Sequence, residues 1–213
     1  LAIASTVATY EMGTRYFQET DTIKLFDDCS YYNQMATTPK QFPRMLQAAM
    51  QTAVTLRGVS VVGLPGDLAA TECQPVDSSL ITYDMSSDIV LEQFWVERLS
   101  KWLNKANKIT IYCGIGAKDA HQEVVELSQR LNAPVAYSFK SKMEIQYDNP
   151  NEVGMTGLLG MPSGYNSMHE AQILLLLGTD FPYTPFMPED NIIVQVDIKA
   201  NRIGRRAKVD MGI

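Results

Sequence analysis

The sequence predicts an α/β protein built on parallel sheets, and three observations carry this prediction. Short, continuously apolar runs recur along the chain, which is typical of strands that are buried on both faces of a parallel sheet. Segments with apolar residues at helical spacing lie between these runs. Glycine-containing turns connect several strands to the helices that follow. Strands that alternate with helices indicate parallel sheets with right-handed crossover connections.

The sequence of residues 1 to about 65 predicts a strand, then a helix and a second strand, which together form the end of one α/β domain. The run LAIAST opens the chain as a buried strand, and the apolar run at 59–65 is a second one. A helix is expected between them, with Thr38 as its cap, Pro39 at the first helical position and Gln41 completing a capping box. Gly58 is expected to end this helix.

A second α/β pattern starts after a break in periodicity. The break runs from Gly66 to about Ser87, and we interpret it as a linker. The expected elements that follow are a helix at 88–108, a strand at 109–113, a helix at 121–132, a strand at 134–139, a short helix near 167–171, and strands at 173–178 and 192–197. We therefore expect two domains, at 1–85 and 86–213.

Composition limits the possible functions. The chain has 213 residues with 46% hydrophobic and 20% charged residues, as in globular proteins. A net charge of −6 argues against nucleic acid as a partner. The basic cluster at 202–208 is interpreted as a solvated turn or helix face. Three cysteines without a CxxC pair fit free thiols in a reducing cytoplasm. No apolar run reaches the ~18–20 residues that span a bilayer. The chain begins without Met, and we expect both ends to be cuts inside a longer protein.

Glycine, acidic and basic residues follow the expected strands at the edge where open α/β sheets bind ligands. Gly114 and Gly116 form a turn between a strand and a helix, which favours a phosphate, although the third glycine of the dinucleotide fingerprint is missing. Asp197 ends a strand and could accept a hydrogen bond from a ribose or ribityl hydroxyl, or cap a helix. Lys140 and Lys142 could neutralise a diphosphate, or be ordinary surface lysines.

Two further segments point to a bound ligand. The segment GMTGLLGMPSG (154–164) has four glycines within eleven residues, so its main chain can lie close to a flat ligand. A flexible loop is the alternative, but Leu158 and Leu159 in its middle predict burial. The segment LLLLGTDFPY (174–183) places small, acidic and aromatic residues at a strand end. Together these signals predict a nucleotide-like cofactor, whereas the two histidines are not at the spacing of a zinc site or a catalytic triad.

Five motifs resemble, in order and spacing, the thiamine-diphosphate enzymes, and among them the FAD-containing pyruvate oxidases, above all the quinone-linked bacterial pyruvate dehydrogenases. These motifs are EMGTRYFQET (11–20), RGVSVVGLPGDLA (57–69), CGIGA (113–117), YDNPNEVGMTGLLG (147–160) and LLGTDFPY (176–183). The resemblance implies that 1–85 is the end of a pyrimidine-binding α/β domain with a linker. It implies that 86–213 is a Rossmann-like central domain that binds FAD.

The resemblance also assigns roles to residues. Phe17 and Gln18 match an FQE element that lines the substrate side of the thiamine site. Lys140 stands where relatives often have arginine, so the cation is kept but the planar fork is lost. The implied FAD-binding residues are Gly114, Gly116, Lys140, Thr156, Gly157, Leu158, Leu159, Thr179, Asp180, Phe181, Pro182, Tyr183 and Asp197.

The activity implied by the resemblance is oxidative decarboxylation of pyruvate to acetate and CO2, with electrons passing through FAD to a quinone. Thiamine diphosphate and Mg²⁺ would be held by motifs outside this chain, so we expect the chain alone to be inactive. The resemblance also implies that the full-length protein is a homotetramer, located in the cytoplasm or peripherally on the inner face of the cell membrane. Four alternatives stay open: an acetolactate synthase-like carboligase, a phosphate-dependent pyruvate oxidase, a non-catalytic flavin- or nucleotide-binding module, and an α/β scaffold that binds no ligand.

Overall fold

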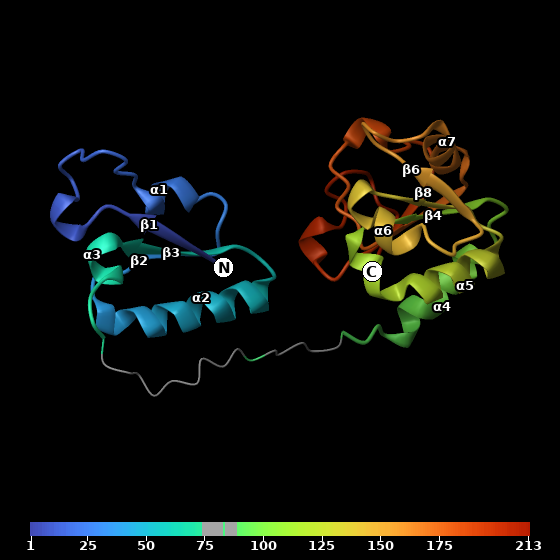
Figure 1. The fold of residues 1–213 in the computed structure, drawn as a ribbon. Coiled ribbons are helices and arrows are strands. Elements are labelled where there is room, and N and C mark those ends of the chain that lie inside the picture. Colours follow the sequence, from blue (N-terminus) through green and yellow to red (C-terminus); the bar gives the residue numbers. More distant parts are fainter. Residues whose placement is uncertain (74–82, 84–88) are drawn as a thin grey trace. The chain divides into compact units, whose positions relative to one another are not determined.

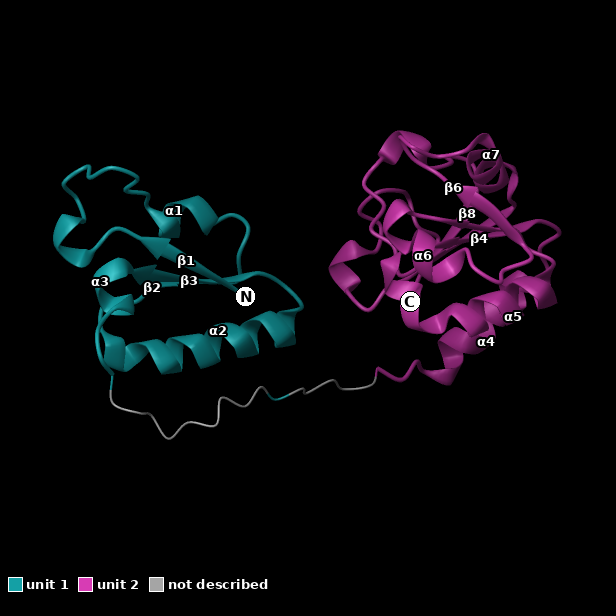
Figure 2. Cartoon of the chain, viewed as in Figure 1, with its two compact units in different colours: residues 1–88 teal, residues 89–213 magenta. Residues whose placement is uncertain are grey.

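The computed structural model describes residues 1–73, 83 and 89–213 (Figure 1). The chain divides into two compact units, residues 1–88 and residues 89–213 (Figure 2). Most of the predicted linker, and the predicted domain boundary between 85 and 86, lie outside the described residues. Each unit is an α/β structure with a parallel sheet, as the sequence predicts.

The first unit has a three-stranded parallel sheet in the order β1-β3-β2. Strand β3 lies in the centre and is almost entirely buried, which matches its apolar sequence. Helix α2 runs along one face of the sheet and α1 lies on the other side (Figure 1). The strands are β1 (Ala2–Thr6), β2 (Tyr32–Met35) and β3 (Ser60–Pro65), and the helices are α1 (Thr22–Phe26), α2 (Phe42–Leu56) and α3 (Gly66–Ala69).

Both ends of α2 differ from the prediction. The capping box does not form, because Pro39–Gln41 is a 3₁₀ turn and the hydroxyl of Thr38 donates to the side-chain oxygen of Gln41 at 3.4 Å instead of accepting from a backbone N–H. At the other end, Arg57 takes the left-handed conformation with φ 47°. The N–H of Gly58 then donates to the Ala53 carbonyl at 3.2 Å.

The second unit has a six-stranded parallel sheet in the order β6-β5-β4-β7-β8-β9. The predicted strands at 109–113, 173–178 and 192–197 are confirmed, whereas the strand predicted at 134–139 is shorter, because Phe139 begins a 3₁₀ turn. The strands are β4 (Ile109–Cys113), β5 (Val135–Tyr137), β6 (Glu152–Met155), β7 (Ile173–Leu177), β8 (Ile192–Val196) and β9 (Met211–Gly212). The helices are α4 (Gln93–Leu103), α5 (His121–Leu131), α6 (Lys142–Ile145) and α7 (Pro162–Glu170).

Apolar side chains cover both faces of this second sheet. On one face Ile111 and Leu175 pack in a cluster that includes Leu103 of α4 and Val124 of α5. On the other face Tyr112 and neighbouring strand residues pack against Met168 of α7 and form a second cluster. Because successive residues of a strand point to opposite faces, the continuous apolar runs fill both clusters. The unit is therefore a Rossmann-like three-layer α/β/α structure.

The differences from prediction in this unit fall at its margins. Strand β9 has two residues at the edge of the sheet, and β6 forms the other edge at the start of the glycine-rich segment. Helix α4 begins at Gln93, later than the predicted 88. Helix α7 begins at Pro162, earlier than the predicted 167, since proline is well suited to a first helical position.

Candidate functional site

A cavity of about 570 Å³ lies at the carboxyl edge of the second sheet. The turns after β4, β5, β6 and β7 contribute its walls, because the carboxyl ends of parallel strands meet at one edge. Its size is in the usual range for small-molecule and cofactor sites. The lining residues are Gly114, Ile115, Ser138, Phe139, Lys140, Met155, Thr156, Gly157, Leu158, Leu159, Gly178, Thr179, Asp180, Phe181, Pro182, Tyr183, Arg202 and Arg206.

The glycines after β4 and β7 let two neighbouring turns touch through their backbones. The N–H of Gly116 donates to the Gly178 carbonyl at 2.9 Å. A Cβ on Gly114 would lie 2.4 Å from that same carbonyl oxygen, so no side chain fits there. Gly114 lines the cavity, whereas Gly116 is not among the lining residues. Residues Ile115–Ala120 form a 3₁₀ turn and α5 begins only at His121, so these glycines do not open directly into an α-helix.

The turn after β6 combines a buried polar group with exposed leucines. Thr156 is 4% exposed, and its hydroxyl is buried without a hydrogen-bond partner. Gly157 has φ +115°, which disfavours other residues, and its carbonyl accepts from Gly160 N at 2.8 Å. Leu158 and Leu159 are each 70% exposed, so the prediction of their burial is wrong. The tight glycine turn directs both side chains outward, where they line the cavity.

The aromatic residues after β7 have two different environments. Phe181 is buried and packs edge-to-face on Tyr112, with ring centroids 5.5 Å apart, and on Tyr183 at 5.4 Å. Pro182 and Tyr183 are exposed, while Thr179 is buried. The segment 179–183 is therefore anchored in the core through Phe181 and presents its other residues at the cavity.

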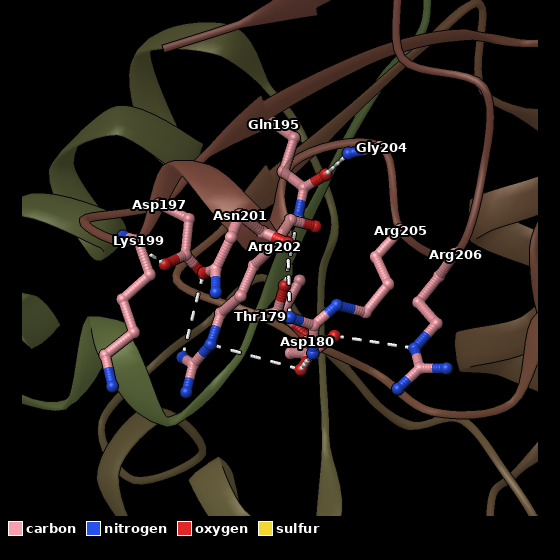
Figure 3. A network of polar contacts seen from close by, with 10 residues as sticks. All are labelled: Thr179, Asp180, Gln195, Asp197, Lys199, Asn201, Arg202, Gly204, Arg205 and Arg206. Atoms are coloured by element: carbon pink, nitrogen blue, oxygen red, sulfur yellow. Dashed lines mark hydrogen bonds and ion pairs between the residues drawn. The ribbon is translucent and has the colours of Figure 1, made fainter.

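Arginine residues are the main feature that the sequence reasoning missed. Asp180 is paired with Arg205 at 2.8 Å, with Arg206 at 3.4 Å and with Arg202 at 3.9 Å (Figure 3). Arg202 and Arg206 line the cavity, so the interpretation of this basic cluster as a solvated face is wrong for these two residues. Lys140 also lines the cavity. Lys142 instead donates to Gln146 within its own short helix and is not among the lining residues.

Asp197 lies beside this group and is not among the cavity-lining residues. One carboxylate oxygen accepts from Lys199 N at 2.8 Å, which stabilises the turn after β8. The other oxygen is buried without a hydrogen bond and lies 4.0 Å from the guanidinium of Arg202. Asp197 therefore has a structural partner and one unsatisfied acceptor.

Phe17 and Gln18 belong to the first unit and take no part in this cavity. Phe17 is 80% exposed. Gln18 has φ 65° and Arg15 has φ 61°, so two non-glycine residues of one loop are left-handed. Such strain is found at functional sites more often than elsewhere.

The thiol of Cys113 and the imidazole of His121 are not among the groups that line the cavity. Burial raises the pKa of the Cys113 thiol to about 12, so this thiol stays protonated at neutral pH. His121 is stacked on Tyr147 at 4.0 Å, away from the lining residues. In residues 1–73, 83 and 89–213, no group of three or more His, Cys, Asp or Glu is placed to hold a metal ion. The helices of that same part of the chain are too short or too polar to cross a bilayer.

The second unit is thus a Rossmann-like α/β domain with a ligand-sized cavity at the carboxyl edge of its sheet. Residues 96–213 match the family described as "Thiamine pyrophosphate enzyme, central domain". The chain belongs to this family.

One of the relatives has thiamine pyrophosphate in its name, which agrees with this assignment. The chain is 42% identical to an uncharacterized 42.6 kDa protein in isoamylase 3'region of Pseudomonas amyloderamosa, over the whole chain and 54% of that relative. It is 31% identical to the putative thiamine pyrophosphate-containing protein YdaP of Bacillus subtilis, over the whole chain and 37% of that relative. It is 25% identical to a pyruvate oxidase of Lactiplantibacillus plantarum, over the whole chain and 36% of that relative. The chain therefore spans about a third to a half of these relatives. Other relatives, at 25% to 28% identity, include acetolactate synthases.

Proposed function

We propose that the chain is the FAD-binding part of a thiamine-diphosphate-dependent enzyme that converts pyruvate to acetate and CO2 and passes electrons through FAD to a quinone. The observation that carries the proposal is the cavity at the carboxyl edge of the sheet. Family membership supports thiamine diphosphate chemistry, and the relative named pyruvate oxidase supports pyruvate as substrate.

The residues of the cavity fit a flavin nucleotide in three respects. The buried hydroxyl of Thr156 has no partner and could hydrogen-bond to a bound ligand. Gly114 and Gly157 lack side chains, so the turn after β7 and the ring of Phe181 pack closely against their backbone and form a smooth cavity wall that suits a flat ligand. Leu158 and Leu159 are exposed apolar groups that a ring system would cover.

In this proposal the ligand is held by the turns after β4, β6 and β7, and Lys140 faces its charged part. Bound FAD would supply a two-electron acceptor. The protein contributes binding, orientation and exclusion of water, through Phe181 as an anchor and the leucines as a cover. Phe17 and Gln18 would line the substrate side of the thiamine diphosphate site, where the left-handed Gln18 fixes the direction of its loop.

The test uses the full-length protein, produced with adequate riboflavin. We expect a bound flavin spectrum that bleaches when pyruvate, thiamine diphosphate and Mg²⁺ are added without oxygen, and that recovers when a soluble quinone is added. Acetate should form in step with quinone reduction. A protein that holds no flavin, or whose flavin stays oxidised in the presence of pyruvate, would overturn the redox assignment.

An acetolactate synthase-like carboligase is the second candidate, because relatives with that name are as similar to the chain as the pyruvate oxidase is. The same cavity could hold FAD without a redox role in the main cycle. The two candidates differ in product: acetolactate formed without reduction of an acceptor would favour the carboligase. Acetyl phosphate formed only with added phosphate would favour a phosphate-dependent oxidase.

A further inference from the structure

The cluster of Asp180, Arg202, Arg205 and Arg206 joins two segments that are distant in sequence. Asp180 follows β7, and the arginines lie between β8 and β9. In Figure 3, Arg202 and Arg206 reach Asp180 from opposite sides. Three guanidinium groups thus converge on one carboxylate beside the cavity.

The three arginines are not equivalent. Arg205 makes the shortest ion pair, at 2.8 Å, donates a second hydrogen bond to the Asn201 carbonyl at 3.1 Å, and does not line the cavity. Arg206 and Arg202 do line it, and their ion pairs with Asp180 are longer, at 3.4 and 3.9 Å. The Nε of Arg206 is buried without a hydrogen-bond acceptor. Arg205 therefore bonds one carboxylate oxygen of Asp180, while the other oxygen, Oδ1, is buried without a hydrogen bond and lies 3.4 Å from Nε of Arg206. The terminal guanidinium nitrogens of Arg206 and Nη2 of Arg202 take no part in the ion pairs with Asp180 and Asp197, so they are donors for another acceptor.

Positive charge exceeds negative charge on the side of the cavity that this cluster forms. The three guanidinium groups face the carboxylates of Asp180 and Asp197, which leaves one positive charge, and Lys140 on the cavity adds another. The whole chain has the opposite sign, with a net charge of −6. A local reversal of charge at a cavity favours an anionic ligand.

Hydrogen bonds within the chain fix the backbone that carries the arginines. The buried side chain of Gln195 donates to the carbonyls of Thr179, at 3.2 Å, and Arg202, at 3.3 Å. Its oxygen accepts from Gly204 N at 3.0 Å (Figure 3). The side-chain amide of Gln195 on β8 thus links the turn after β7 to the backbone of residues 202–204. This backbone is therefore preorganised for binding.

We propose that Arg202 and Arg206 form an anion-binding wall that selects ligands with a diphosphate group, while Arg205 is a positioning residue that neutralises Asp180. The buried, unpartnered hydroxyl of Thr156 on the same cavity independently points to a polar ligand there. The inference rests on the proposed function in that FAD is the expected source of the diphosphate. Guanidinium groups suit this role because their planar fork matches phosphate oxygens.

The experiment measures calorimetric affinity of the full-length, flavin-stripped protein for FAD, ADP and riboflavin at low and high salt. Arg206→Gln and Arg202→Gln should each weaken FAD and ADP by about 10- to 30-fold, the lower part of the range for a charge-assisted hydrogen bond, because both side chains are a third exposed. Riboflavin has no phosphate, so its affinity should not change. Arg130→Gln, on the exposed end of α5, is the matched control and should leave all three affinities unchanged.

The outcomes separate this inference from the proposed function. If both variants bind FAD with the affinity and salt dependence of the wild type, the anion-binding wall is overturned. The FAD assignment would still stand. Equal weakening of riboflavin would also overturn it, since the loss would then not depend on phosphate. Binding of ADP without FAD would support the wall and overturn the flavin role.

The role of Arg205 has its own test. Arg205→Gln leaves the Asp180 carboxylate without its best partner, so that carboxylate competes for Arg202 and Arg206, and FAD affinity should fall about 3-fold. Adding Asp180→Asn to this variant removes the competing charge and should restore the affinity. A double variant that binds FAD more weakly than Arg205→Gln would show a merely structural role and overturn the positioning assignment.

Discussion

The middle of the second sheet and its carboxyl edge differ in the exposure of their leucines and in the hydrogen bonds of their buried threonines. In the middle, Leu174 is fully buried, and the hydroxyl of Thr110 donates to the Ser167 carbonyl at 2.6 Å. At the edge, Leu158 is 70% exposed, and the equally buried hydroxyl of Thr156 has no partner. Buried atoms without a hydrogen-bond partner occur in both regions, since the hydroxyl of Tyr112 on β4 also has none. The edge differs in that its unpartnered hydroxyl lies on a cavity that exposed apolar side chains also line. This difference favours the edge as the binding region.

Leucine truncations should give the largest contrast between the two regions. Leu174→Ala should lower the free energy of unfolding by about 2–5 kcal/mol, because it leaves a cavity in a closely packed core. Leu158→Ala should change it by less than about 0.5 kcal/mol but weaken FAD binding. Denaturant unfolding and calorimetric titration of the full-length protein check the pair. Equal destabilisation by both substitutions would contradict the assignment of Leu158 to the ligand.

Glycine substitutions test how tightly the edge is built. Gly114→Ala should cost about 1–3 kcal/mol, because its Cβ would lie 2.4 Å from the Gly178 carbonyl oxygen and 2.5 Å from the Thr179 Cα, both backbone atoms. Gly66→Ala is the control, since the nearest atom to its Cβ would be 3.7 Å away. Thermal unfolding should separate the two variants. A Gly114→Ala protein as stable as Gly66→Ala would mean that the two turns do not touch as described.

Two threonine-to-valine substitutions should give the smallest changes in the free energy of unfolding. The change should be a loss of stability for Thr110 and no loss or a slight gain for Thr156. Thr110→Val removes a satisfied hydrogen bond and should destabilise by about 1 kcal/mol without changing FAD affinity. Thr156→Val removes an unsatisfied buried hydroxyl, so it should leave the ligand-free protein as stable or slightly more stable, and weaken FAD binding. Unfolding in the absence and presence of FAD measures both. Loss of stability in ligand-free Thr156→Val would indicate a partner within the protein.

Much of the fold could be predicted because its central strands are continuous apolar runs. The runs at 109–113 and 173–178 are strands at the middle of the sheet, where burial on both faces leaves little choice of residue. Strands β2, β6 and β9 were not predicted, because edge strands are short and carry polar residues or glycine. Their pairing depends on neighbours that are distant in sequence.

The cavity was only partly predictable for a similar reason. Residues 179–183 come just after the predicted strand β7, so their place at the edge is a consequence of local pattern. Residues 156–159 follow β6, which was not predicted, and only their glycines pointed to a ligand. Arg202 and Arg206 come from a segment without a strong signal, and they reach Asp180 through the tertiary fold. The exposure of Leu158 and Leu159 reverses what their hydrophobicity suggests, because the conformation of a glycine turn decides where they point.

The outward leucines have a consequence for handling the protein. Two adjacent apolar side chains at an open rim form a surface that, when no ligand covers them, can adhere to a second molecule or to a chaperone. Protein prepared from riboflavin-starved cells should therefore aggregate sooner during storage than protein whose flavin site is filled. The solubility of the purified protein would then depend on the riboflavin supply of the producing cells.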